Sequence, residues 1–250
     1  MFTEPILGSA HEGLMTMQSD PRYALYFAPQ VSSALWRLGS EWLGRCAASG
    51  RLLEQPRLRG VDAKAFARIT AAPRRYGLHA TLKAPFRLAE GRTLQELLAE
   101  VRTWGVAQSP FRMPPLQVRL LEDFLALVPA HDDHRANAVA AECVMRFDAY
   151  RAPLNAVELA KRAPHRLDAH AARMLDLWGY PHVLDLFRFH LSLTGPLPED
   201  DTLRAVLQAQ AEARFVHSEI PAEFFDSVCV FEEAGPGADF RLVERIRFGA

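Results

Sequence analysis

The sequence contains 250 residues, of which 49% are hydrophobic and 24% are charged, and its formal net charge is −1. These proportions are typical of a globular protein that buries a sizeable core. The neutral balance argues against duplex nucleic acid as a partner, because duplexes bind to strongly basic surfaces, but it leaves room for a local pocket that binds a small anion.

Alternating apolar residues and turn signals predict strands interspersed with capped helices. Strands are expected at residues 22–29, 77–84, 116–121, 124–129, 187–194, 225–232 and 240–248. Helices are expected at residues 33–43, 62–70, 93–104, 135–150, 166–178 and 201–214. The third helix begins with the capping box Thr93–Glu96. This order indicates an α+β fold in which antiparallel sheets carry helices on their outer faces.

Two of the expected strands each place a histidine and a hydroxyl on one face. Residues i and i+2 of a strand point the same way, so His79 pairs with Thr81, and His190 pairs with Ser192. The apolar residues between them point into a core. Two such strands facing each other would surround a small anion with an acid, a base and two hydroxyl groups.

The sequence around each histidine follows the same plan. A proline comes six residues after His79 and six residues after His190, and Thr-Leu pairs at Thr93 and Thr202 open the next helices. This repetition predicts a duplication with a pseudo-two-fold axis. We therefore expect one bilobal domain over residues 21–250, with duplicated antiparallel sheets and outer helices.

The stretch 76–86, YGLHATLKAPF, resembles the two-histidine (2H) phosphoesterase superfamily and its HxTx motif. Within that superfamily the chain is similar to the DUF1045 group, which is associated with phosphonate metabolism. Residues 22–29, 124–129 and 189–195 support the resemblance. Ser192 departs from the threonine that is more frequent in the family, but it keeps the hydroxyl group.

The resemblance implies a cyclic phosphodiesterase-like fold and a metal-independent hydrolase that uses no cofactor. One histidine would act as general base and the other as general acid, while Thr81 and Ser192 would bind the non-bridging phosphate oxygens. The implied substrate is a ribose cyclic phosphate, specifically phosphoribosyl 1,2-cyclic phosphate from phosphonate metabolism. The alternatives are a 2′,3′-cyclic nucleotide or RNA-end phosphodiesterase, and a non-catalytic nucleotide- or phosphate-binding module.

Four further residues are candidate substrate contacts. Lys83 is four residues after His79 in the same expected strand, so its side chain is predicted to point to the same face. A solvated lysine at the rim of the site is an alternative of equal weight. Tyr26 and Arg22 lie on the less apolar face of the first strand, where ordinary packing is the alternative. Thr194 continues the face of His190, but a threonine at a strand end is usually structural.

Other signals bear on metals, location and processing. The run 131–134, HDDH, is interpreted as an exposed loop and not as a metal site, and no Walker loop is present. Three separated cysteines indicate reduced thiols in a cytoplasmic protein. Residues 1–20 lack the pattern of a signal peptide, so a flexible leader is expected, and no apolar run is long enough to span a membrane. The oligomeric state is left open.

Overall fold

The structure is a computed structural model that describes residues 21–163, 167–216 and 223–249. The leader predicted at residues 1–20 lies outside these ranges. Within them, no helix has the length and apolar character needed to cross a lipid bilayer.

Nine strands are described, and all of their pairings are antiparallel. The strands are β1 (Arg22–Phe27), β2 (Ala80–Arg87), β3 (Phe111–Arg112), β4 (Leu116–Leu121), β5 (Phe124–Pro129), β6 (Leu191–Ser192), β7 (Phe224–Phe225), β8 (Ser227–Glu233) and β9 (Arg241–Arg247). They form a four-stranded sheet in the order β2-β1-β8-β9, a three-stranded sheet β4-β5-β6 and the short pair β3-β7.

The helices of the described ranges begin and end at local signals. They are α1 (Ala34–Leu43), α2 (Ala63–Ile69), α3 (Ala71–Arg74), α4 (Leu94–Val106), α5 (His134–Arg146), α6 (Ala156–Arg162), α7 (Ala169–Trp178) and α8 (Asp201–Phe215), with 3-10 turns η1 (Asp148–Tyr150) and η2 (Leu184–Leu186). The Ser33 hydroxyl caps α1, and Gly44 ends it in a left-handed conformation. The capping box at Thr93 is present, as the sequence predicts.

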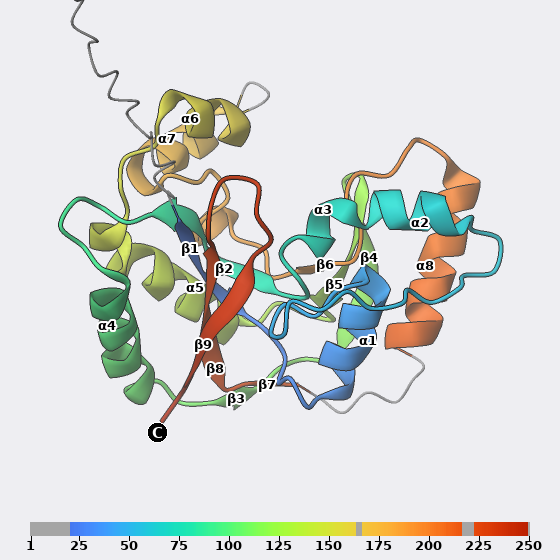
Figure 1. Cartoon of the computed structure of the whole chain (residues 1–250), viewed down its shortest axis with the longest axis horizontal. Helices are drawn as coiled ribbons and strands as arrows, with labels where there is room; N and C mark the ends of the chain where they lie inside the picture. Colours follow the sequence, from blue (N-terminus) through green and yellow to red (C-terminus); the bar gives the residue numbers. More distant parts are fainter. Residues whose placement is uncertain (1–20, 164–166, 217–222, 250) are drawn as a thin grey trace, which may run out of the picture.

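The helices cover the sheets, which confirms the predicted α+β class. In Figure 1, α4 and α5 lie beside the four-stranded sheet, where α5 packs against β2 and α4 against β9. On the other side of the molecule α8 packs against β4. The two larger sheets differ in strand number, and the pseudo-two-fold axis and the two-lobe division stay predictions.

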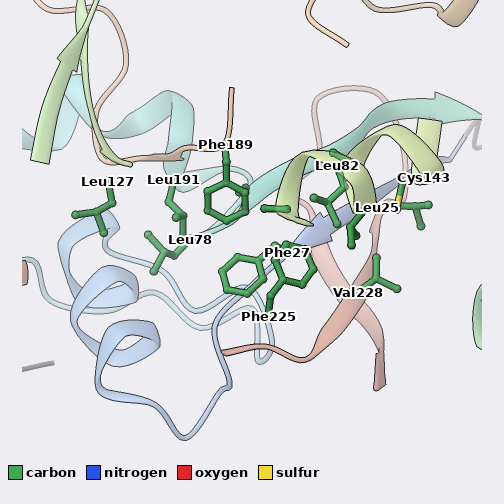
Figure 2. Packing of buried hydrophobic residues seen from close by; sticks show 14 of the residues in the cluster. Leu25, Phe27, Leu78, Leu82, Leu127, Cys143, Phe189, Leu191, Phe225 and Val228 are labelled. Atoms are coloured by element: carbon green, nitrogen blue, oxygen red, sulfur yellow. The ribbon is translucent and has the colours of Figure 1, made fainter. Parts of the chain in front are cut away.

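The main core packs the apolar residues that flank both histidines. Figure 2 shows Leu78, Leu127 and Leu191 on one side of this cluster, and the ring centroids of Phe27 and Phe225 lie 4.9 Å apart within it. The predicted inward-facing residues are all buried in this one cluster: Ala80, Leu82, Leu191 and Leu193. Burial of these side chains, worth about 1.5–3 kcal/mol for each large one, holds the two histidine segments against each other.

Several elements differ from the sequence-based expectation, including the short helix α3 and strand β3, which were not predicted. The strand predicted at 187–194 is regular only at Leu191–Ser192, because the backbone N–H groups of Leu193 and Thr194 both donate to the carbonyl of Leu125 and break the ladder. The helix predicted to reach residue 150 ends at Arg146 and continues as η1. Helix α6 was not predicted at all, since its short apolar pattern is weak.

Candidate active site

Both histidine motifs line one cavity of about 610 Å³. His79, Thr81, His190 and Ser192 all contribute to its wall, so the structure brings together the four residues predicted as catalytic. The volume lies in the range of small-molecule sites and is far larger than a single phosphate group needs. Among the described residues, no group of three or more His, Cys, Asp or Glu side chains could hold a metal ion, and the HDDH run lies at the start of α5.

The imidazole of His79 is held in a defined tautomer. Its Nδ1 lies 2.9 Å from the carbonyl oxygen of Gly77, which only accepts, so Nδ1 carries the proton and donates it. The neutral ring therefore presents an unprotonated Nε2, which lies 3.3 Å from the Thr81 hydroxyl. Gly77 adopts a φ of +79°, a backbone conformation that glycine accepts without strain.

His190 repeats the same arrangement. Its Nδ1 donates to the carbonyl oxygen of Arg188, 2.8 Å away and again two residues earlier in the chain. Its ring packs beside Phe124 at a centroid distance of 5.6 Å. Both imidazoles thus keep their proton on Nδ1 and offer Nε2 as the basic atom.

Burial keeps both rings neutral at physiological pH. Desolvation, with a smaller contribution from the nearby charge of His190, lowers the pKa of His79 to about 4. Desolvation also lowers the pKa of His190. Both groups are therefore proton acceptors, and an anion bound between them would raise their pKa values.

Tyr26 supports His79. The side chain is fully buried, and its ring centroid lies 3.9 Å from that of His79. Burial raises the pKa of the Tyr26 hydroxyl, so it stays protonated. Tyr26 does line the cavity, as the prediction of a substrate contact requires, but its closest measured ring contact is with the imidazole that it positions.

The predicted anion contact of Lys83 is corrected by the structure. Its Nζ donates to Asp148 Oδ1 and to the carbonyl oxygen of Val144, both at 3.0 Å, and the side chain is 3% exposed. The pairings Tyr26↔Thr81 and Leu25↔Lys83 leave one extra residue on β2, which is a β-bulge. A bulge re-aims the side chains that follow it, so Lys83 does not share the face of His79 and packs against α5.

Thr194 and Arg22 both line the cavity, and their roles as substrate contacts stay predictions. The Thr194 side chain is 2% exposed, and its hydroxyl accepts the backbone N–H of Leu125 at 3.0 Å, so the hydroxyl supports the fold beside the cavity. Arg22 lines the cavity, and its Nε donates to the buried carboxylate of Glu233.

Sequence reasoning missed most of the basic and polar groups of the cavity wall. The basic residues are Arg75, Arg87, Lys161 and Arg162, and the others are Tyr76, Asn155, Glu158 and Tyr180. They come from the end of α3, from β2, from α6 and from the segment after α7, so no local motif connects them. The one sequence feature that points to them is the frequency of arginine near other cavity residues. Arginine-rich stretches are common on protein surfaces, so this feature alone does not predict a binding site.

The comparisons with known proteins place the chain in a family. The family model described as "Protein of unknown function (DUF1045)" matches residues 81–241, which is more than half of the chain. This chain belongs to that family. The match includes Thr81 and the whole His190 motif.

Two curated relatives are named "Ribose 1,5-bisphosphate phosphokinase PhnN". The protein from Janthinobacterium sp. (strain Marseille) is 38% identical over 236 residues, which are 94% of this chain and 52% of the relative. The protein from Laribacter hongkongensis (strain HLHK9) is 36% identical over 223 residues, which are 88% of this chain and 50% of the relative. The chain spans about half the length of these relatives.

The relatives' names overturn the predicted activity. They describe a phosphokinase, which transfers a phosphoryl group, and not a phosphoric diester hydrolase. The prediction of a cyclic phosphodiesterase, together with its hydrolase class, is therefore wrong by this comparison. The expected setting in phosphonate metabolism and a phosphorylated ribose as ligand are both compatible with the names.

Proposed function

We propose that this chain binds a small phosphorylated ribose in the cavity, and that His79 and His190 exchange protons with the bound molecule. One observation carries the proposal: both imidazoles donate Nδ1–H to a backbone carbonyl two residues earlier and line the same cavity. Each Nε2 is left as a proton acceptor. Such a pair can take a proton from one oxygen and return it to another, and each transfer is worth roughly 10²–10⁴-fold in rate.

The other groups of the wall suit a phosphate ester. The hydroxyls of Thr81 and Ser192 lie beside the imidazoles, and each can donate to a bound phosphate once the Thr81 O–H turns away from His79 Nε2. Arginine side chains line other parts of the cavity. Arginine binds phosphate oxygens through paired N–H groups. The names of the relatives, which specify a phosphorylated ribose, support the choice of sugar.

The sequence has no G-x-x-x-x-G-K-[ST] loop, the usual cradle for nucleotide phosphates. We therefore assign to this chain the binding of the sugar phosphate, and not the binding of a nucleoside triphosphate. The two H-x-(T/S) motifs at one cavity support wider membership in the two-histidine superfamily. The three free thiols support a cytoplasmic setting.

Calorimetric titration with ribose 5-phosphate tests the proposal. Repeating the titration in two buffers of different ionisation enthalpy measures the protons taken up on binding. We expect proton uptake near neutral pH, because a bound phosphate raises the pKa of His79 from about 4. His79→Asn and His190→Asn should each reduce the uptake, whereas His131→Asn, at an exposed loop position, should match the wild type.

Two outcomes would contradict the proposal. If ribose 5-phosphate binds no better than unphosphorylated ribose, the cavity does not recognise the phosphate. If it binds with the same proton uptake in the wild type and in both histidine variants, the imidazoles take no part in proton transfer to the ligand.

A further inference from the structure

Glu233, the last residue of β8, is a carboxylate that a ligand cannot reach, because its side chain is 0% exposed. The sheet register places it directly opposite Arg22 on β1, so the two side chains are cross-strand neighbours. Its Oε2 accepts the Nε–H of Arg22. Its Oε1 accepts from Nη2 of Arg75 and, at 2.9 Å, from the backbone N–H of Gly237. These three donors compensate the cost of burying the charge.

The three partners of Glu233 all line the cavity. Arg22 comes from β1, Arg75 follows α3, and Gly237 lies in the turn between β8 and β9. The arginine side chains are 23% and 26% exposed, so a ligand in the cavity can contact them. One buried carboxylate therefore joins three parts of the cavity wall that are distant from one another in the sequence.

Arg75 is fixed on several sides and lies close to the His79 motif. Its Nε donates to the carbonyl oxygen of Ala238 at 2.9 Å, and its guanidinium lies 5.3 Å from the ring centroid of Tyr76. The Tyr76 centroid is in turn 5.7 Å from that of His79. Because one aromatic ring neighbours both groups, the arginine and the imidazole can contact the same small ligand.

The two arginines keep donors and charge for an anion. Glu233 holds Arg22 through Nε, and the Nη atoms of Arg22 make no hydrogen bond within residues 21–163, 167–216 and 223–249. A guanidinium is planar, so a contact at one edge also sets the direction of its other N–H groups. Two guanidinium charges share one carboxylate charge, which leaves one positive charge to attract phosphate oxygens.

We propose that Glu233 is a positioning residue for anion binding. It does not touch the ligand, and it orders Arg22 and Arg75 so that their remaining N–H groups bind phosphate oxygens. Without the carboxylate the two like charges would repel each other, and the ligand would have to order both side chains at a cost in affinity. The inference rests on the proposed function, because it assumes that a phosphorylated sugar occupies the cavity.

Glu233→Gln separates positioning from simple charge balance, because the two roles predict opposite changes. If Glu233 only reduced the positive charge of the cavity, neutralising it would tighten the binding of an anion. Positioning predicts the reverse: calorimetric titration with ribose 5-phosphate should show binding about 10- to 100-fold weaker than in the wild type, the value of a lost charge-assisted hydrogen bond.

Glu232→Gln is the matched control. It removes the same charge from the adjacent residue, whose carboxylate accepts from the Tyr23 hydroxyl at 3.0 Å. Successive residues of a strand point to opposite faces, so Glu232 lies on the other face of β8 from Glu233. This variant should bind ribose 5-phosphate at least as tightly as the wild type.

Arg22→Lys and Arg75→Lys keep every charge and test the geometry alone. Lysine carries a single nitrogen, which cannot hold the carboxylate and also present a fixed fork of N–H groups to a phosphate. Each variant should bind about tenfold more weakly than the wild type. Urea unfolding identifies which variants are folded, and the two lysine variants provide the test if Glu233→Gln is not.

The outcomes distinguish this inference from the proposed function. If the wild type does not bind ribose 5-phosphate, the proposed function fails and the role of Glu233 fails with it. If the wild type binds and folded Glu233→Gln binds as tightly or more tightly, positioning is refuted and the proposed function stands. An equal loss in Glu232→Gln, or wild-type affinity in both lysine variants, would refute positioning in the same way.

Discussion

The buried pair of Lys83 and Asp148 allows a sharp test of where this lysine acts. Lys83 is 3% exposed and Asp148 is 24% exposed, and their charged atoms are 3.0 Å apart. Asp148→Asn keeps the shape of the side chain but removes the charge that compensates the ammonium group. Removing one partner of a buried ion pair costs roughly 3–5 kcal/mol. Because Asp148 is partly exposed, we expect a loss near the lower end, about 3 kcal/mol.

Lys83→Met is the matched variant. Methionine fills a similar volume without a charge, and Asp148 keeps Arg151, whose nitrogens lie 2.8 Å and 3.0 Å from its two carboxylate oxygens. Because Arg151 still compensates the Asp148 carboxylate, this change leaves no uncompensated buried charge, so we expect a loss of about 1 kcal/mol or less. The double variant should then show a coupling energy of about 2 kcal/mol between the two residues.

Urea unfolding near neutral pH measures the stabilities, and titration with ribose 5-phosphate measures binding in the same variants. Affinity should stay at the wild-type value in folded Lys83→Met, because Nζ is committed to Asp148 and Val144. The reasoning is refuted if Asp148→Asn unfolds within about 0.5 kcal/mol of the wild type, the usual effect of a neutral surface change. It is equally refuted if Lys83→Met loses affinity while keeping full stability.

Three further predictions follow from the packing around the site. Gly77→Ala should cost about 1–3 kcal/mol, because φ is +79° and a Cβ there would lie 2.5 Å from the Cβ of Ala47. Acid should destabilise the fold through His79, whose pKa of about 4 in the folded protein lies below the ordinary value of about 6.5. As the pH falls, the unfolded chain therefore binds the proton before the folded protein does. The free energy of unfolding should drop by about 3 kcal/mol in total as the pH falls from about 6.5 to below 4. Thr194→Val should cost about 1–3 kcal/mol, because the buried N–H of Leu125 loses its acceptor, and binding of ribose 5-phosphate should not change.

Urea unfolding checks all three, each with its own control. Gly91 has a similar positive φ but nothing near a new Cβ, so Gly91→Ala should be milder than Gly77→Ala; equal losses would mean that the contact with Ala47 is unimportant. His79→Asn should flatten the acid limb of the stability curve, and an unaltered limb would show that another group titrates there. Thr194→Ser keeps the hydroxyl and should recover most of the loss; if it resembles Thr194→Val, the hydrogen bond is not the cause.

The sequence was informative where the physical cause is local. Side-chain caps at Ser33 and Thr93 satisfy free N–H groups within one helical turn, so α1 and α4 could be located from a few residues. The histidine motifs could also be predicted locally, because successive residues of a strand point to opposite faces. This alternation alone separates the histidines and hydroxyl residues from the buried Ala80 and Leu191. Family resemblance extended this reading correctly to DUF1045, but it led to a hydrolase activity that the names of the relatives contradict.

The sequence by itself thus determined the two H-x-(T/S) motifs and the α+β class, since both depend on the periodicity of neighbouring residues. Only the tertiary structure decided what surrounds them. A bulge in β2 turns Lys83 away from the cavity, because register is set by pairing with β1, a strand more than fifty residues earlier in the sequence. Arg22 and Arg162 line the same cavity because β1 and α6 pack around it, and no pattern within either element predicts that they come together.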